Sequence, residues 1–158
     1  MRSLLLILAS ALVLSVSVSA QPEQPKANPS YDPELAKRLG ADEIGMKTYV
    51  LCILKDGPRH DEITGQERTD IFTGHFANIR RLADEGKLAV AGPLEKNDRS
   101  YSGLYIFNVP TIKEAEKLVV LDPAVKAGIF VPELTLWYAS AALMAVPELH
   151  KKLQKPKD

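Results

Sequence analysis

The residues with the clearest capacity for chemistry in this sequence are His75 and Asp122, which lie far apart along the chain. His75 falls in a run whose apolar residues recur every three or four positions, as on one helix face: Ile71, Phe72, Phe76, Ile79 and Leu82. An imidazole on such a face needs a hydrogen-bond partner, because an unpaired polar group in a core is destabilising. A carboxylate from Asp122 would accept from one ring nitrogen and leave the other to act as a general acid or base.

Each of these two residues also has a purely structural explanation. His75 could be a core histidine that is satisfied by a backbone carbonyl. Asp122 precedes Pro123, so it also fits the N-cap of a short helix, a role that contributes about 1 kcal/mol. A carboxylate has two oxygens, so Asp122 could cap that helix and orient His75 at the same time.

Five other residues in or beside predicted strands are candidates for substrate binding. Tyr49 and Trp137 could line an aromatic pocket, although packing in the core or in a dimer interface also explains them. Lys55 ends a strand and could attract an anion, or it could be a solvated lysine. Gly92 and Pro93 stop the second strand, and a turn at that point would also shape the rim of a pocket.

Motifs for metals and cofactors are missing from the sequence. His60 and His150 are too scattered to complete a metal site with His75, and no HxxxH spacing occurs. The sequence has neither a Gly-rich phosphate loop nor a G-x-S-x-G nucleophile motif. We therefore expect no metal and no cofactor.

The first 20 residues have the pattern of a secretory signal peptide. Arg2 gives a positive start, residues 4–14 are almost entirely apolar, and small residues lead to a cleavage position after Ala20. The apolar part is short for a membrane span, which needs about 20 residues, although an uncleaved anchor is the alternative. We therefore expect a periplasmic or secreted protein with no membrane span after cleavage.

Charge and cysteine content exclude several other functions. The 158 residues carry 20 basic and 20 acidic side chains and no dominant basic patch, so no nucleic-acid partner is expected. Cys52 is the single cysteine, which excludes a disulfide within the chain. It lies in an apolar strand, where a buried and inert thiol is the favoured state.

The predicted elements follow the order strand, helix, strand, strand, helix, strand. A polar linker with a short helix occupies residues 21–45, and the domain itself spans 46–143, followed by a tail from 144 to 158. Within the domain, strands are predicted at 47–55, 88–91, 103–109 and 133–140, and long helices at 67–85 and 111–121. This order is typical of an α+β, ferredoxin-like βαββαβ domain, with a four-stranded antiparallel sheet and two helices on one face.

Both faces of the predicted sheet are apolar. In the first strand, alternate residues divide into two apolar sets: Val50, Cys52 and Leu54 against Tyr49, Leu51 and Ile53. The helices cover one face, so a second copy of the chain, packed sheet against sheet, is the expected cover for the other. The alternative is that the segment 141–149 folds back over the sheet.

Four stretches, taken together, carry a family resemblance: MKTYVLCILKDGP (46–58), GHFANIRRLADEGKLAVAGPL (74–94), GLYIFNVPTIKEAEKLVVLDPAVKAGIF (103–130) and LTLWYASAAL (134–143). With a histidine in the helix, a strand-ending Gly-Pro and a late Asp-Pro, they resemble the YciI-like (YCII-related) family. The resemblance implies a ferredoxin-like domain that forms a dimeric α/β barrel. It also implies an active-site His–Asp pair, matched here by His75 and Asp122.

The sequence is therefore interpreted as that of a small exported enzyme acting on a small organic molecule. His75 and Asp122 would supply general acid–base chemistry for an isomerisation or an elimination. The alternative is a non-catalytic module that binds or senses a small ligand on the same dimeric scaffold.

Overall fold

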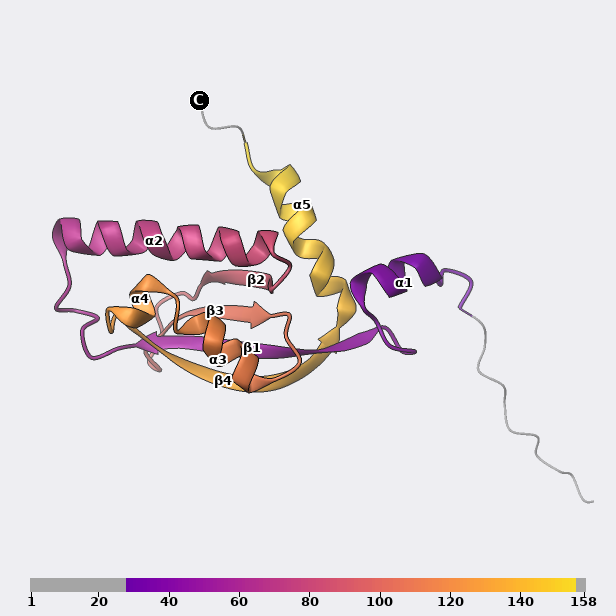
Figure 1. Cartoon of the computed structure of the whole chain (residues 1–158), viewed down its shortest axis with the longest axis horizontal. Coiled ribbons are helices and arrows are strands. Elements are labelled where there is room, and N and C mark those ends of the chain that lie inside the picture. The colour runs from indigo at the N-terminus through magenta and orange to yellow at the C-terminus, as the bar shows by residue number, and fades with distance from the viewer. Residues whose placement is uncertain (1–27, 156–158) are drawn as a thin grey trace, which may run out of the picture. The chain divides into compact units, whose positions relative to one another are not determined.

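The computed structural model describes residues 28–155, so the predicted signal peptide and the first part of the linker lie outside the described residues. The chain divides at residue 32, and the unit that starts there contains the fold (Figure 1). That unit begins with the predicted short helix, α1 (Pro33–Leu39), whose N-terminus is capped by the Asp32 side chain. No helix among the described residues is long and apolar enough to cross a membrane.

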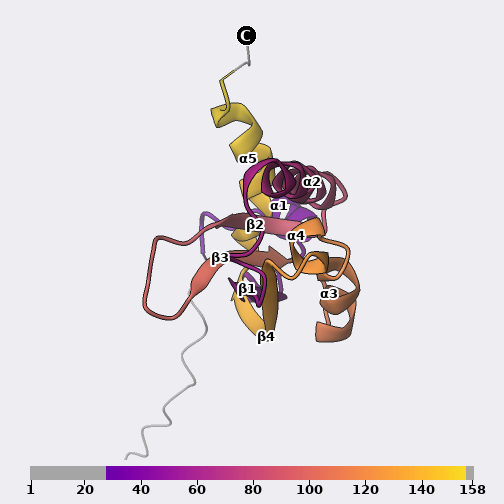
Figure 2. The ribbon, with the colours of Figure 1, turned by 90° about the vertical axis from the view of Figure 1, so that its left-hand side faces the viewer.

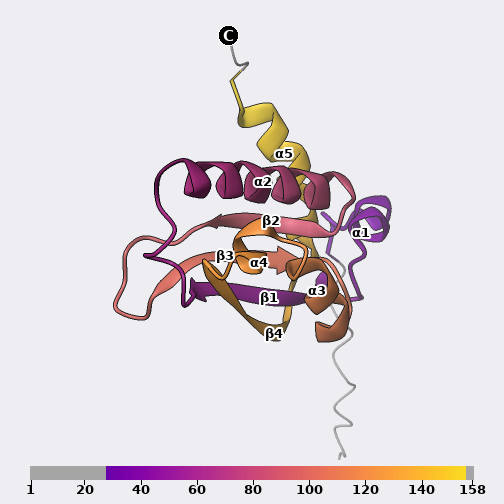
Figure 3. The same cartoon turned by 60° about the vertical axis from the view of Figure 1, so that its left-hand side comes forward.

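Four antiparallel strands form one sheet in the order β2-β3-β1-β4 (Figure 3). Their bounds are Met46–Asp56 (β1), Leu88–Pro93 (β2), Tyr101–Phe107 (β3) and Phe130–Ser140 (β4). The predicted α+β class and four-stranded antiparallel sheet are confirmed, and the arrangement is consistent with a ferredoxin-like fold. In the centre of the sheet, Cys52 of β1 lies opposite Tyr105 of β3 and Leu134 of β4.

Strand β4 starts earlier than predicted. The sequence prediction placed its start after Pro132, near Glu133, whereas the strand begins at Phe130. Pro132 pairs in register with Leu54, and β4 is an edge strand of the sheet. A proline is tolerated there because its missing N–H can face away from the ladder. The third strand is also displaced, since it runs over 101–107 instead of 103–109.

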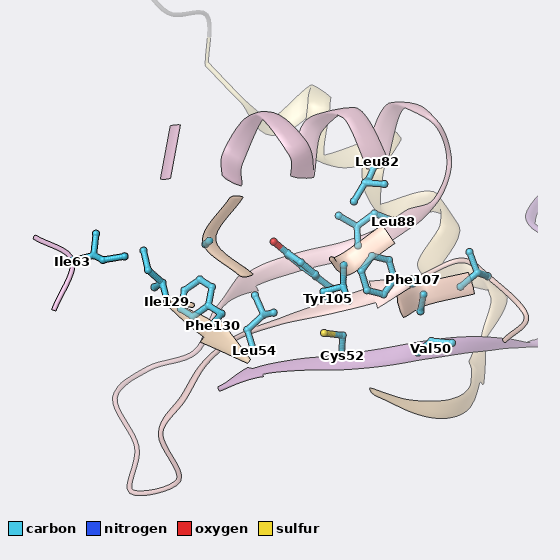
Figure 4. Close-up of a cluster of buried hydrophobic side chains, with 14 residues drawn as sticks. Val50, Cys52, Leu54, Ile63, Leu82, Leu88, Tyr105, Phe107, Ile129 and Phe130 are labelled. Carbon is cyan, nitrogen blue, oxygen red and sulfur yellow. The ribbon is translucent and has the colours of Figure 1, made fainter. Parts of the chain in front are cut away.

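Three helices pack against one face of the sheet: α2 (Gly65–Asp84), α3 (Ile112–Val119) and α4 (Pro123–Lys126). The predicted capping residue Thr111 accepts from the backbone N–H of Glu114 at the start of α3. Figure 4 shows the buried cluster on this face, in which Cys52 and Phe107 project toward Leu82 of α2. Burial of this apolar cluster holds α2 and α4 together over the sheet.

The opposite face of the sheet is covered in part by the end of the domain. Leu143 and Met144, from the 3₁₀-helix η1 (Ala141–Ala145), pack against a smaller buried cluster that includes Tyr49 and Ile106. Helix α5 (Val146–Leu153) continues from η1 beside β2 (Figure 2). Trp137 on this face is still 38% exposed. The segment after residue 140 therefore folds back over one end of the face and leaves other apolar residues exposed.

Candidate active site

Packing of α2 against α4 brings His75 and Asp122 together. His75 lies in the middle of α2, and Asp122 is the residue that caps the N-terminus of α4. Nδ1 of His75 is 2.9 Å from Oδ1 of Asp122 and 3.0 Å from Oδ2. The His75 side chain is 7% exposed and that of Asp122 is fully buried. The contact predicted from the sequence is therefore present, and Asp122 makes both of its predicted interactions.

Asp122 accepts hydrogen bonds from three further groups. The Tyr105 hydroxyl donates to Oδ2 at 2.8 Å, and the backbone N–H of Ala124 donates to Oδ1 at 2.9 Å. The Asn78 amide donates to Oδ2 at 3.3 Å. The hydroxyl of Tyr105 also lies 3.2 Å from Nδ1 of His75. Donors from α2, β3 and α4 thus fix the carboxylate from several directions, which removes the freedom that would otherwise let the imidazole rotate.

The surrounding donors determine the charge of Asp122. Burial would raise the pKa of its carboxyl, but the hydrogen bond and charge of His75, with the donors from Tyr105 and Ala124, hold that pKa below its ordinary value of 3.8. Burial and the neighbouring carboxylate raise the pKa of the Tyr105 hydroxyl, so it stays protonated and donates. Because an ionised carboxylate only accepts, Nδ1 of a neutral His75 carries the hydrogen and Nε2 keeps a lone pair.

Gly74 allows the two helices to approach closely enough for this contact. A Cβ atom built on Gly74 would lie 2.9 Å from Cγ of Pro123, which is closer than carbon atoms normally pack. Gly74 precedes His75 and Pro123 follows Asp122. A glycine inside a helix costs stability of about 1 kcal/mol relative to alanine, and here it lets the neighbouring residues meet.

The His75 ring lines a cavity of about 270 Å³ between α2 and the β2–β3 edge of the sheet. The hydrogen bonds of His75 to other described residues all involve Nδ1. Nε2 forms none of these bonds and is not a buried, unpaired atom, so it is accessible. The remaining lining residues are mostly apolar: Leu54, Phe72, Phe76, Ile79, Ala91, Gly92, Pro93, Ser102, Gly103, Tyr105 and Phe130. The arrangement therefore leaves one ring nitrogen available to a molecule in the cavity.

The five predicted binding residues divide into two groups. Gly92 and Pro93 line the cavity. Tyr49 does not, because it is buried on the opposite face of the sheet, where its ring lies 6.4 Å from that of Trp137. Lys55 is also on that face and forms an ion pair with Glu133 at 3.1 Å. The alternation of side chains along β1 and β4 accounts for this separation, since these three positions all point away from the helices.

A second histidine–aspartate pair lies close to the same cavity. Nδ1 of His60, in the turn after β1, is 3.4 Å from Oδ1 of Asp56. The two atoms are not oriented for a hydrogen bond. Asp56 accepts a hydrogen bond from the hydroxyl of Ser102 at 2.5 Å, and Ser102 lines the cavity. No group of three His, Cys, Asp or Glu side chains among residues 28–155 is placed to hold a metal ion.

Sequence analysis missed three residues that support the His75–Asp122 contact, namely Asn78, Tyr105 and Gly74. Asn78 follows His75 by three positions, so a second polar side chain on the buried helix face was a usable signal. Tyr105 lies in a predicted strand, but the need of its buried hydroxyl for a partner was not considered. The role of Gly74 depends on the packing of α2 against α4, which the sequence pattern does not specify.

Comparison with known proteins places the domain in a family. The YCII-related domain family matches residues 48–137, more than half of the chain. No curated protein matches. One similar solved structure is the 5-chloro-2-hydroxyhydroquinone dehydrochlorinase from Burkholderia phenoliruptrix in complex with 2,5-dihydroxybenzoquinone. It is 24% identical, covers 56% of this chain and 90% of its own, and has a TM-score of 0.39, which is too low to support an argument. The family match alone decides the assignment: the chain belongs to the YCII-related domain family.

Proposed function

We propose that this protein is an enzyme that uses His75 and Asp122 for general acid–base chemistry on a small organic molecule. One observation carries the proposal: Nδ1 of His75 is bound by both oxygens of a buried carboxylate, at 2.9 and 3.0 Å, while the same ring lines a cavity. A histidine with only a structural role in the core would have no ring nitrogen available to a cavity.

The chemistry begins with Nε2 of His75 taking a proton from an acidic C–H or O–H group of the substrate. The imidazolium that forms is stabilised by Asp122, which keeps its negative charge throughout. His75 then returns the proton to a different substrate atom, which is an isomerisation, or to a departing group, which is an elimination. Proton transfer of this kind needs only the two side chains and the substrate.

Proton abstraction can be tested before the substrate is known. Neutral carbon acids that also carry a hydroxyl group, such as 3-hydroxyacetophenone and 4-hydroxyphenylacetone, are incubated with the protein in D₂O, and deuterium incorporation at carbon is followed by mass spectrometry. Exchange above the buffer rate is expected for the wild type, because a positioned base accelerates proton transfer by about 10²–10⁴-fold. His75→Ala should abolish this gain, whereas His150→Ala, an exposed position on α5, should keep it.

The alternative of a binding or sensing module makes a different prediction. If ligands bind in a His75-dependent manner but no carbon acid exchanges and no product forms, the catalytic proposal fails and the binding function remains. If His75→Ala instead unfolds the protein, His75→Gln, which keeps a polar side chain of similar length, separates loss of chemistry from loss of structure.

We also propose that the protein works in the periplasm or outside the cell, after cleavage near Ala20. The support is the sequence of residues 1–20, with its positive start, apolar run and small residues. Expression of the full chain followed by N-terminal sequencing of the exported fraction should give a protein that starts at Gln21. An intact N-terminus retained in the membrane fraction would contradict this.

We propose further that two copies associate through the sheet face that carries Trp137. Apolar side chains on this face, including Trp137 and Val131, remain 38% and 45% exposed, as expected of a surface that a partner covers. Light scattering should give a dimer for the wild type and a monomer for Trp137→Glu. Leu136→Glu is the matched control, because Leu136 neighbours Trp137 in β4 but points to the other face.

A further inference from the structure

The cavity beside His75 has few polar groups, and none of its lining residues is a lysine, arginine, aspartate or glutamate. Its polar side chains are those of His75, Ser102 and Tyr105. The other side chains that line it are apolar, and several of them are aromatic. The class of molecule that binds therefore depends on whether these three polar groups present hydrogen-bond donors or acceptors.

Both hydroxyl groups in the wall direct their hydrogens away from the cavity. The Tyr105 hydroxyl donates to Oδ2 of Asp122 at 2.8 Å, and the Ser102 hydroxyl donates to Oδ1 of Asp56 at 2.5 Å. A hydroxyl has a single hydrogen, and an ionised carboxylate can only accept. Each hydroxyl is therefore committed as a donor and has no hydrogen to offer to a bound molecule.

His75 presents the same polarity to the cavity. Its Nδ1 is bound to the Asp122 carboxylate and carries the hydrogen, so Nε2 is an acceptor in the neutral ring. None of the three polar side chains in the wall thus has a hydrogen to offer, while Nε2 of His75 is a free acceptor. A ligand that fits must supply the hydrogens.

The charges around the cavity disfavour an anion. Asp122 and Asp56 lie directly behind the polar side chains of the wall, and the lining residues include no lysine or arginine. Arg68 belongs to the neighbouring surface hollow, where it lies 5.1 Å from the Phe72 ring and donates to backbone carbonyls of His60 and Ile63. A carboxylate or phosphate placed in the cavity would lose its hydration and face two carboxylates.

We propose that the cavity binds uncharged molecules with an apolar, ring-sized body and hydroxyl or N–H donors. In this proposal Ser102, oriented by Asp56, accepts a hydrogen bond from the ligand, whereas His75 transfers the proton. This assignment rests on the proposed function, because it names the substrate class of the same site. The volume of about 270 Å³ is at the lower end of ligand sites, and it suits a single substituted ring.

Three probes that share one ring test this class: 4-fluorophenol, 4-fluoroanisole and 4-fluorobenzoate, with binding measured by ¹⁹F NMR at pH 7. The phenol should bind about tenfold or more tightly than the anisole, which lacks the donor hydrogen. The benzoate should not bind at concentrations that saturate the protein with the phenol. Ala91→Phe, which fills the cavity, should remove binding of the phenol and so locate it at this site.

Two variants test the role of Ser102 and Asp56. Ser102→Ala should weaken phenol binding about two- to tenfold, since one acceptor is lost. Asp56→Asn lets an amide donate to Ser102, so the serine hydrogen can turn toward the cavity. The anisole, which only accepts, should then gain affinity by about two- to tenfold while the phenol loses some. Circular dichroism establishes that both variants are folded.

The outcomes that overturn this proposal differ from those that overturn the proposed function. Equal affinity for phenol and anisole, tighter binding of the benzoate, or no binding of any probe to the folded protein would each overturn the ligand class. None of these results measures proton transfer. Conversely, a phenol preference without any His75-dependent exchange would keep the ligand class and remove the catalytic function.

Discussion

His75 and His60 each lie beside an aspartate, but the two pairs differ in burial and in the number of groups that hold them. The Asp122 carboxylate is fully buried and accepts from four donors, including His75 at 2.9 Å. The Asp56 side chain is 35% exposed, lies 3.4 Å from His60 and accepts one hydrogen bond from a side chain, that of Ser102.

The comparison shows what a dyad needs beyond two compatible side chains. Water can replace a lost partner of Asp56, so no single contact there is essential. Asp122 is fully buried, so solvent cannot replace its carboxylate as the acceptor for the donors around it. Burial therefore converts ordinary hydrogen bonds into a fixed geometry, which a base in a catalytic site requires.

The largest expected difference between the pairs is in stability. Asp122→Ala should lower the free energy of unfolding by about 3–5 kcal/mol, because it leaves buried donors without an acceptor. Asp56→Ala should cost about 1 kcal/mol or less, since that pair is partly solvated. Urea denaturation of the two variants measures both values. Similar losses would show that burial does not distinguish the pairs.

Gly74→Ala should have a smaller effect that falls on the His75–Asp122 pair alone. The added methyl group meets the Pro123 ring at 2.9 Å, so α4 must shift, at a cost of about 1–3 kcal/mol offset in part by the better helix propensity of alanine. The ¹⁵N chemical shifts of His75 should change and those of His60 should not. Thr73→Ala, an exposed neighbour on α2, is the control and should leave both rings unchanged.

The dependence of stability on pH should report the charge of Asp122. The folded-state pKa of Asp122 is lowered, so its contribution is fully present above its ordinary value of 3.8 and is lost as pH falls below it. Unfolding free energies of the wild type and of Asp122→Asn should therefore converge on acidification below that value. Tyr105→Phe removes one donor, raises the pKa of Asp122, and should shift this convergence to higher pH. Curves that stay parallel would contradict the assignment of charge to Asp122.

The sequence predicted the elements of the sheet better than their ends. Period-two alternation and turn residues located all four strands, because the buried faces impose that pattern. The start of β4 was placed after Pro132, since the sequence does not show that this strand lies at an edge where proline is tolerated.

The candidate site was predicted in its two main residues and missed in its supporting ones. His75 was recognisable as a polar residue on an apolar face, and Asp122 as a carboxylate in a constrained turn. Which face of the sheet the helices cover was not specified by alternation, so Tyr49, Lys55 and Trp137 were named as candidates although they lie on the side away from the cavity. Ser102 was not recognised, because its contact with Asp56 depends on the register of β1 and β3.

The burial of Cys52 has a practical consequence for measuring this protein. Its thiol is inaccessible, and its pKa is raised to about 12 by burial and by the charge of Asp122, so almost no thiolate exists at neutral pH. A thiol-specific reagent can react only after the core between β1 and the helices has opened. Since the chain contains one cysteine, its labelling rate reports that opening directly, and slower labelling in the presence of a ligand would reveal binding without any knowledge of the reaction.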